Sequence, residues 1–337
     1  MLPALAIADA LKARGARVTF AGSPDRVEAQ LVPDAGFEFD PFRISGFPRE
    51  PSLALLRALA LAGRAPLACR QILDRRRPDV VLGGGGYVAG PMVLAAWTRR
   101  IPAALTEADS HLGLANRIAA PFARRVFLSF PIEGRRAPKF VVTGRPVHSR
   151  SRAVSREEGR RLFELPPDGP VLLVFGGSQG ARSLNELVVA ELGPAGPAVL
   201  HLAGERDYEE LRHRVTRPDY RLLPFTHDFG AALGASDLVL ARAGGSVYEL
   251  AAAGKPAVLV PYPFATADHQ AKNARYFEQA GAAVVVPDSD AARVPGLVRE
   301  LLADPARLAT MSERMLAVAR PDAADEIAEE LIGLAGR

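Results

Sequence analysis

The chain has 337 residues, of which 48% are hydrophobic and 24% are charged, a balance typical of folded globular proteins and not of disordered ones. This length suits two domains. The single cysteine, Cys69, excludes a disulfide framework and a cysteine-based zinc cluster, so a reducing cytosol is the expected environment. No apolar run reaches the ~18 to 20 residues that span a bilayer, and the first residues lack the basic segment of a secretory signal.

Charge is unevenly distributed along the chain. Residues 1–150 hold 22 Lys and Arg against 12 Asp and Glu, and the rest hold 20 against 26, although the net charge is only +4. Such an asymmetry favours an anionic partner for the first half; the alternative is a surface simply solvated by arginine. Nucleic acid is disfavoured as that partner, because the basic residues are not interleaved with aromatic ones.

Twelve short apolar runs, bounded by Gly, Pro or charged residues, predict twelve strands. They are expected at 17–22, 37–42, 79–85, 102–108, 125–130 and 139–144, and then at 170–177, 197–204, 220–225, 237–245, 256–263 and 282–287. The stretches between them carry apolar residues at helical spacing and often end at Gly. Strands that alternate with helices and are almost continuously apolar predict parallel sheets covered on both faces. Two successive sets predict two doubly wound domains, joined through a polar linker near 143–152.

Three of the predicted strand-to-helix turns are rich in glycine: 80–91 (VVLGGGGYVAGP), 171–181 (VLLVFGGSQGA) and 241–256 (ARAGGSVYELAAAGKP). In open parallel sheets ligands bind beyond the carboxyl ends of the strands, where helix N-termini offer free N–H groups that suit a phosphate. No GxxxxGK[ST] occurs, which disfavours a P-loop NTPase. The glycines at 84–90 are too widely spaced for a dinucleotide fingerprint, so a dehydrogenase remains only a weak alternative.

Together with DHQAKNARYFEQAGAA at 268–283, these three segments closely resemble the MurG family of UDP-GlcNAc transferases, from residue 2 to the C-terminus. The resemblance implies a GT-B glycosyltransferase in which two Rossmann-like domains face a cleft. It places an acceptor and membrane-facing domain at 1–145, a UDP-GlcNAc-binding domain at 146–318, and a C-terminal helix at 319–337 that packs back toward the first domain.

The family pattern assigns most of the donor site to the second domain. The diphosphate would be met by backbone amides, hydroxyls and helix dipoles, without a metal and without any other cofactor. Glu249 matches the carboxylate that accepts the ribose hydroxyls, and Gln270 matches the glutamine that contacts the donor sugar. The expected UDP-GlcNAc-binding residues are Gly177, Ser178, Gly180, Asn185, Phe225, Thr226, Gly245, Ser246, Glu249, Gln270, Asn273, Arg145 and His148.

Several positions depart from the family pattern. The stretch His-Glu-Gln-Asn of the family reads Thr106-Glu107-Ala108-Asp109 here, and an arginine after the interdomain segment is replaced by His148. Arg145 is a candidate substitute for that arginine. Gly85, Gly86 and Tyr87 are the expected acceptor-side residues.

The first predicted helix of the chain begins near Pro3. In the family this helix is preceded by a strand and a Gly-Gly-Thr-Gly-Gly-His turn, which do not occur in this sequence. The first strand of the N-terminal domain and the histidine proposed as general base are therefore absent from this sequence. A start codon assigned too far downstream is favoured over a degenerate relative. Glu107 and Asp109 are then the remaining candidates for the general base.

Two classes of function fit these residues. The first is an inverting glycosyltransferase that moves GlcNAc from UDP-GlcNAc to the C4 hydroxyl of the muramyl sugar of undecaprenyl-linked lipid I, at the cytoplasmic face of the cell membrane. The alternative is a GT-B nucleotide-sugar-binding relative with a different acceptor or no transfer activity. The Leu-, Ala- and Arg-rich stretch at 52–77 favours peripheral contact with an anionic membrane surface, against the alternative of an ordinary helix with solvated arginines.

Overall fold

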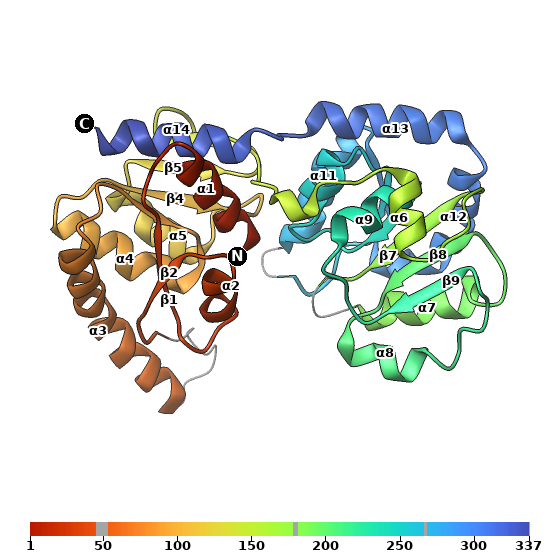
Figure 1. The fold of residues 1–337 in the computed structure, drawn as a ribbon, viewed down its shortest axis with the longest axis horizontal. Coiled ribbons are helices and arrows are strands. Elements are labelled where there is room, and N and C mark those ends of the chain that lie inside the picture. Colours follow the sequence, from red (N-terminus) through yellow and green to blue (C-terminus); the bar gives the residue numbers. More distant parts are fainter. Residues whose placement is uncertain (45–52, 178–180, 266–267, 337) are drawn as a thin grey trace. The chain divides into compact units, whose positions relative to one another are not determined.

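A computed structural model describes residues 1–44, 53–177, 181–265 and 268–336, with side chains from residue 63 onward in the second range. The chain divides into two compact units: residues 1–146 together with 321–337 form unit 1, and residues 147–320 form unit 2 (Figure 1). All twelve strands predicted from the apolar runs are confirmed.

Unit 1 alternates helices and strands. Its elements are α1 (Leu2–Ala13), β1 (Thr19–Gly22), α2 (Glu28–Asp34), β2 (Glu38–Pro41), α3 (Leu53–Arg76), β3 (Val81–Gly83), α4 (Gly86–Thr98), β4 (Ala103–Glu107), α5 (Leu114–Ala119), η1 (Ala120–Phe122), β5 (Arg125–Leu128), β6 (Phe140–Val142) and α14 (Ala323–Ala335).

The strands of unit 1 belong to two separate parallel sheets. β1 pairs with β2, and β3, β4, β5 and β6 pair in that order. In the part of the chain that the structure describes, no strand pairs with both β1 and β3. The missing first strand stays a prediction: among the described residues, β1 has only β2 as a neighbour and β3 has only β4.

Alternate residues of the four-stranded sheet pack on opposite faces. Ala103 and Leu105 join a core with α3, α4 and α5, whereas Ala104 and Phe127 pack with α1 and α14. This period of two is the ordinary consequence of strand geometry. Figure 1 shows α14 lying beside α1 in this unit.

Unit 2 repeats the alternation around one larger sheet. Its elements are η2 (Ser149–Ser151), α6 (Arg156–Leu162), β7 (Val171–Phe175), α7 (Arg182–Leu192), β8 (Ala198–Leu202), α8 (Glu205–Leu211), β9 (Tyr220–Leu223), α9 (Phe229–Ala235), β10 (Leu238–Ala241), α10 (Val247–Ala252), β11 (Ala257–Leu259), α11 (His269–Gln279), β12 (Ala283–Val285), η4 (Asp288–Arg293), α12 (Val294–Leu302) and α13 (Pro305–Val318).

The six strands of unit 2 are all parallel, in the order β12-β11-β10-β7-β8-β9. The chain runs outward from β7 to β9 and then returns to place β10 on the other side of β7. The strand order therefore reverses between β7 and β10, and such a reversal opens the crevice in which doubly wound sheets bind their ligands.

Candidate functional site

The turns after β7 and β10 both lie at the carboxyl edge of the sheet in unit 2, on either side of the point where the strand order reverses. Gly177 follows β7 with φ +90°, a conformation that L side chains rarely adopt. Ser178 and Gly180, which were expected to complete this turn, lie outside the described residues. α7 begins at Arg182 and directs its N-terminus to the same edge, where its free N–H groups favour an anion.

The turn after β10 carries Gly245 and Ser246 into α10, and Ser246 occupies the N-cap position of that helix. Glu249 lies in the first turn of α10 and is partly exposed. Its carboxylate accepts a hydrogen bond from the hydroxyl of Ser151 at 2.6 Å. Sequence reasoning missed Ser151, because 98 residues separate it from its partner.

Two predicted residues of α11 have different surroundings. Gln270 is partly exposed, and its Oε1 accepts a hydrogen bond from the backbone N–H of Tyr262 at 2.9 Å. Asn273 is fully buried, and its amide donates to the carbonyl of Ala243 at 3.4 Å. This hydrogen bond holds the segment between β10 and α10 against α11.

Asn185 also supports the site from the interior. It is completely buried in the first half of α7, and its amide nitrogen donates to the carbonyl of Ala203 at 2.8 Å and to Asp207 at 2.9 Å. Its oxygen lies 3.0 Å from Nε2 of His201. The side chain of Asn185 is thus hydrogen bonded within the protein core and holds α7 onto β8, and its contact with the nucleotide stays a prediction.

His201 is held in one tautomer by this network. The oxygen of Asn185 can only accept, so Nε2 carries the proton, and Nδ1 then accepts from the hydroxyl of Tyr220 at 2.8 Å. Burial lowers the pKa of His201 to about 3, and the nearby Asp207 carboxylate offsets this only in part. The imidazole is consequently neutral at physiological pH.

The end of β9 carries the residues expected beside the uracil base. Phe225 is exposed, and its ring stacks edge-on against that of His227 with 5.0 Å between centroids. The hydroxyl of Thr226 accepts from the backbone N–H of Asp228 at 3.0 Å, which shapes the turn into α9. Both residues lie at the same carboxyl edge as the glycine turns.

The two basic candidates near the linker fall in different units, since the boundary lies between Pro146 and Val147. Arg145 belongs to unit 1, and His148 belongs to unit 2. His148 is buried, and its Nδ1 accepts from the backbone N–H of Arg150 at 3.2 Å, so that it caps η2.

Arg242 is a further buried group at this edge that the sequence did not single out. Its guanidinium donates to the hydroxyl of Ser183 at 2.8 Å and to the carboxylate of Asp288 at 2.6 Å. It thereby ties the turn after β10 to α7 and to η4. Asp288 and Asp290 form an Asp-x-Asp sequence, but the first of these carboxylates is already neutralised by Arg242.

In unit 1 the glycine turn after β3 lies next to the loop after β4. A Cβ atom at Gly83 would come within 2.7 Å of a side-chain carbon of Leu105, so a larger residue would displace that buried side chain, and Gly85 has φ +91°. Gly86 opens α4, and Tyr87 packs partly against the core beneath it. These are the predicted acceptor-side residues.

Glu107, a predicted candidate for the general base, is buried, and its carboxylate is fully engaged. It accepts from the backbone N–H groups of Ala108, Asp109 and Gly113 and from the amide of Asn116, at 2.9 to 3.2 Å. The carboxylate of Glu107 thereby fixes the loop after β4, and its role as general base stays a prediction that these hydrogen bonds disfavour. Asp109 is partly exposed on the loop that Glu107 holds.

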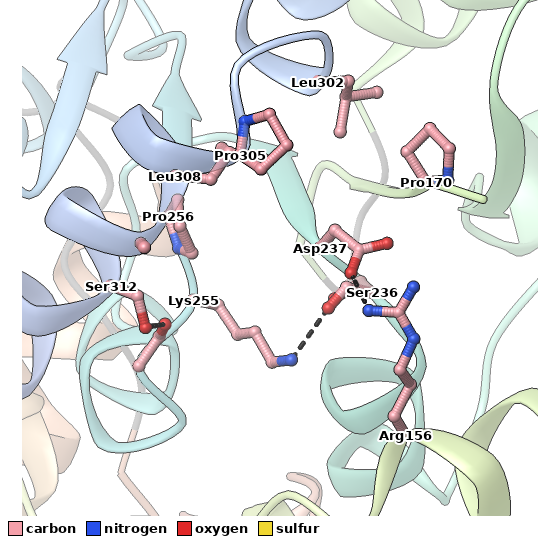
Figure 2. Close-up of a pocket in the computed structure, with 12 residues that line it drawn as sticks. Arg156, Pro170, Ser236, Asp237, Lys255, Pro256, Leu302, Pro305, Leu308 and Ser312 are labelled. Atoms are coloured by element: carbon pink, nitrogen blue, oxygen red, sulfur yellow. Dashed lines mark hydrogen bonds and ion pairs between the residues drawn. The ribbon is translucent and has the colours of Figure 1, made fainter. Parts of the chain in front are cut away.

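A cavity of about 420 Å³ lies at the opposite edge of the sheet in unit 2, below the amino ends of β7, β10 and β11 (Figure 2). Lys255 lines it and donates to the carbonyl of Ser236 at 2.7 Å, while Asp237 pairs with Arg156. Burial lowers the pKa of Lys255. The polar groups of this cavity bond to one another, and it lies away from the glycine turns.

No helix in the described part of the chain is long and apolar enough to cross a membrane.

Comparisons with known proteins agree with this arrangement. Residues 1–128 match the model of the glycosyltransferase family 28 N-terminal domain, and residues 171–327 match that of the C-terminal domain. The chain is 42% identical to a UDP-N-acetylglucosamine–N-acetylmuramyl-(pentapeptide) pyrophosphoryl-undecaprenol N-acetylglucosamine transferase of Acidithiobacillus ferrooxidans, over 100% of this chain and 95% of that protein. It is 37% identical to the protein of the same name from Halothermothrix orenii, over 95% and 91%.

A solved structure shows the same fold. The crystal structure of MurG from Acinetobacter baumannii superimposes with a TM-score of 0.77 at 27% identity, covering 98% of this chain and 95% of that one.

Proposed function

The chain belongs to the MurG family of transferases, whose halves are glycosyltransferase family 28 domains, and from this premise we propose its reaction. It transfers GlcNAc from UDP-GlcNAc to the C4 hydroxyl of the muramyl sugar of undecaprenyl-pyrophosphoryl-MurNAc-pentapeptide. The observation that carries the assignment is the pair of glycine turns on either side of the β7–β10 reversal, with Glu249 and Gln270 on the two helices beside them.

The chemistry assigns a distinct task to each group. The C4 oxygen of the acceptor attacks C1 of GlcNAc with inversion, its proton passes to a base, and the bond from C1 to the diphosphate oxygen breaks. The free N–H groups at the start of α7 stabilise the negative charge that develops on the leaving UDP. The sequence offers two candidates for this base, Glu107 and Asp109. The carboxylate of Glu107 is already hydrogen bonded to the loop after β4, so we propose Asp109 as the base.

The donor residues have separate tasks. Glu249 accepts hydrogen bonds from the ribose hydroxyls, and Gln270 contacts the GlcNAc hydroxyls from α11. Phe225 and Thr226 flank the uracil at the end of β9. These assignments rest on the family pattern and on the shared edge of the sheet.

Transfer of radiolabelled GlcNAc from UDP-GlcNAc to a lipid I analogue tests this function directly. We expect product that depends on both substrates and on Gln270. Tight UDP-GlcNAc binding without any transfer would instead identify a nucleotide-sugar-binding protein of the same fold. Transfer to other sugars but not to the muramyl acceptor would correct the acceptor alone.

We further propose that unit 1 contacts an anionic membrane surface at the cytoplasmic face. Among the side chains that the structure describes on α3, α4 and α5, which share one core, four large apolar ones are exposed: Leu67, Trp97, Leu114 and Ile118. Arginines lie beside them in sequence, at Arg64, Arg100 and Arg117. Exposed apolar side chains flanked by basic ones are typical of proteins that bind the membrane interface.

The basic end of the 52–77 stretch offers less free positive charge to a membrane surface than its sequence suggested. Arg75 pairs with Asp40 at 2.6 Å, and Arg76 binds both Asp40, at 2.7 Å, and Glu38. These arginines hold α3 to β2, so their charges are largely neutralised within the protein. The side chain of Arg57 lies outside the described residues.

Cosedimentation with phosphatidylglycerol vesicles tests the membrane proposal. We expect the double variant Trp97→Ser and Ile118→Ser to bind these vesicles much more weakly, while its turnover of a water-soluble acceptor is unchanged. Leu162→Ser, at an equally exposed leucine of α6, is the matched control. If the wild type, the double variant and Leu162→Ser bind the vesicles equally, these side chains do not form the membrane-binding surface.

A further inference from the structure

The hydrogen bond from Ser151 to Glu249 joins the start of unit 2 to the helix that follows the β10 turn. Ser151 is 3% exposed, and its hydroxyl is 2.6 Å from Oε1 of Glu249. A hydroxyl facing a carboxylate can only donate, and hydrogen bonds to an ionised acceptor are short and comparatively strong. The bond occupies one of the two carboxylate oxygens.

The backbone holds Ser151 firmly in this place. Its N–H donates to the carbonyl of His148 at 2.9 Å, within the short helix η2. The neighbouring carbonyl of Arg152 lies so close to α9 that a Cβ atom at Gly230 would be 2.0 Å from it. Glycine at position 230 therefore lets the segment 149–152 lie directly on α9.

Glu249 has the opposite character, since a partly exposed glutamate can rotate about three side-chain bonds. A fixed donor at one oxygen restricts that rotation before any ligand binds. Preorganisation of this kind raises affinity because the ligand no longer has to order the side chain.

We infer that Ser151 is a positioning residue for the ribose of the donor nucleotide: its hydroxyl fixes the carboxylate of Glu249 in the orientation that accepts the ribose hydroxyls. This inference rests on the proposed function, in which Glu249 binds the ribose. Ser151 itself touches Glu249 and acts on the nucleotide only through it.

The test compares the binding of UDP and 2′-deoxy-UDP by calorimetry, because only a role in ribose recognition changes the ratio of the two dissociation constants. We expect Ser151→Ala to weaken UDP binding about tenfold, the loss typical of one hydrogen bond to a charged group, with a smaller loss for 2′-deoxy-UDP, which keeps only the 3′ hydroxyl. Ser151→Thr keeps the hydroxyl and should restore most of the preference for UDP. Ser149→Ala, an exposed serine of the same short helix, is the control that should match the wild type.

The possible outcomes distinguish a failure of this inference from a failure of the proposed ribose binding by Glu249. If Ser151→Ala weakens both nucleotides equally, its role is only structural and the inference is wrong. If Glu249→Gln abolishes the preference for UDP and Ser151→Ala does not, the inference fails while the ribose assignment stands. If Glu249→Gln leaves the preference intact, the ribose assignment fails and the inference fails with it. A urea unfolding curve of each variant checks separately that it is folded.

Discussion

The side-chain amide of Asn116 donates to Oε2 of Glu107 at 2.9 Å and to the carbonyl of Thr106 at the same distance. One asparagine thereby bridges the end of β4 and the carboxylate that organises the following loop. The loop carries Asp109, so the geometry of the candidate base depends on the hydrogen bonds that Glu107 accepts from Ala108, Asp109 and Gly113.

Substitutions at these two carboxylates should therefore have different effects. Glu107→Gln places an amide where N–H donors converge and should lower the free energy of unfolding by about 1 to 3 kcal/mol. Asp109→Asn should leave stability nearly unchanged and lower kcat by about 10²- to 10⁴-fold, as expected for loss of a general base. Urea unfolding and transfer kinetics measure both. A stable Glu107→Gln variant with the larger loss of kcat would reverse the assignment.

Arg160 should be among the most sensitive positions of unit 2. It is 2% exposed and donates to the carbonyls of Ala235, Pro166, Pro167 and Gly169, and to Asp237 at 2.9 Å. Arg160→Ala should cost about 3 to 5 kcal/mol, because it leaves buried acceptors unpaired. Arg161→Ala, at the exposed neighbour, should change the free energy of unfolding by less than about 0.5 kcal/mol. Similar urea midpoints for the two variants would contradict this account.

Gln270→Ala and Glu249→Ala should each weaken UDP-GlcNAc binding by about 1 to 3 kcal/mol, the cost of an unpaired hydrogen-bonding group. Gln270 also accepts from Tyr262, so its loss should loosen the loop after β11. Gln279→Ala, an exposed glutamine of the same helix, is the control. Unchanged titration curves for both variants would remove these residues from the site.

Chelation of divalent cations should leave UDP-GlcNAc binding largely intact. The glycine turns offer N–H groups to the diphosphate, and the carboxylate of Asp288 already forms an ion pair with Arg242 at 2.6 Å. Calorimetric titration in EDTA measures the effect. If binding disappears in EDTA and returns with Mg²⁺, a bound metal ion coordinates the diphosphate and this prediction is wrong.

The buried imidazole of His201 should make unit 2 less stable in acid. Burial lowers its pKa to about 3, whereas a histidine in the unfolded chain titrates near pH ~6.5. As the pH falls below ~6.5, the unfolded chain binds a proton that the native protein excludes, so the free energy of unfolding falls by at most ~1.4 kcal/mol per pH unit. The loss continues until the pH approaches the folded pKa.

The difference between wild type and His201→Gln isolates this contribution, since all other titratable groups are present in both proteins. We expect their unfolding free energies to converge as the pH is lowered from 6.5 to 4. Parallel pH profiles would show that His201 takes up its proton without unfolding.

The sequence predicted the strands because each apolar run ends at a residue that stops a strand. It also contained the signal for Asn185, which shares the buried face of α7 with Val188, Val189 and Leu192 at helical spacing. The same holds for Glu107, which lies on the same face of β4 as the buried Ala103 and Leu105. Motif matching assigned both residues to ligand contact or catalysis, although periodicity places them on the core side.

Other features had no local signal. The bond between Ser151 and Glu249 depends on how η2 lies on α9, which in turn depends on Gly230. Arg242 reads as an ordinary surface cation, yet it is buried among Ser183, Asp288 and the carbonyls after β11. Pairings between distant segments are set by tertiary packing, and no spacing rule records them.

The grouping of α14 with residues 1–146 means that unit 2 is an insertion within unit 1. Ile327, Leu331 and Leu334 complete a core with Ile7, Ala104 and Phe127, and Arg14 forms ion pairs with Asp325 and Glu329. During synthesis all of unit 2 leaves the ribosome before α14 does. Since domains fold as units while the chain emerges, unit 2 is able to fold first, and one face of unit 1 stays uncovered until the last helix is made.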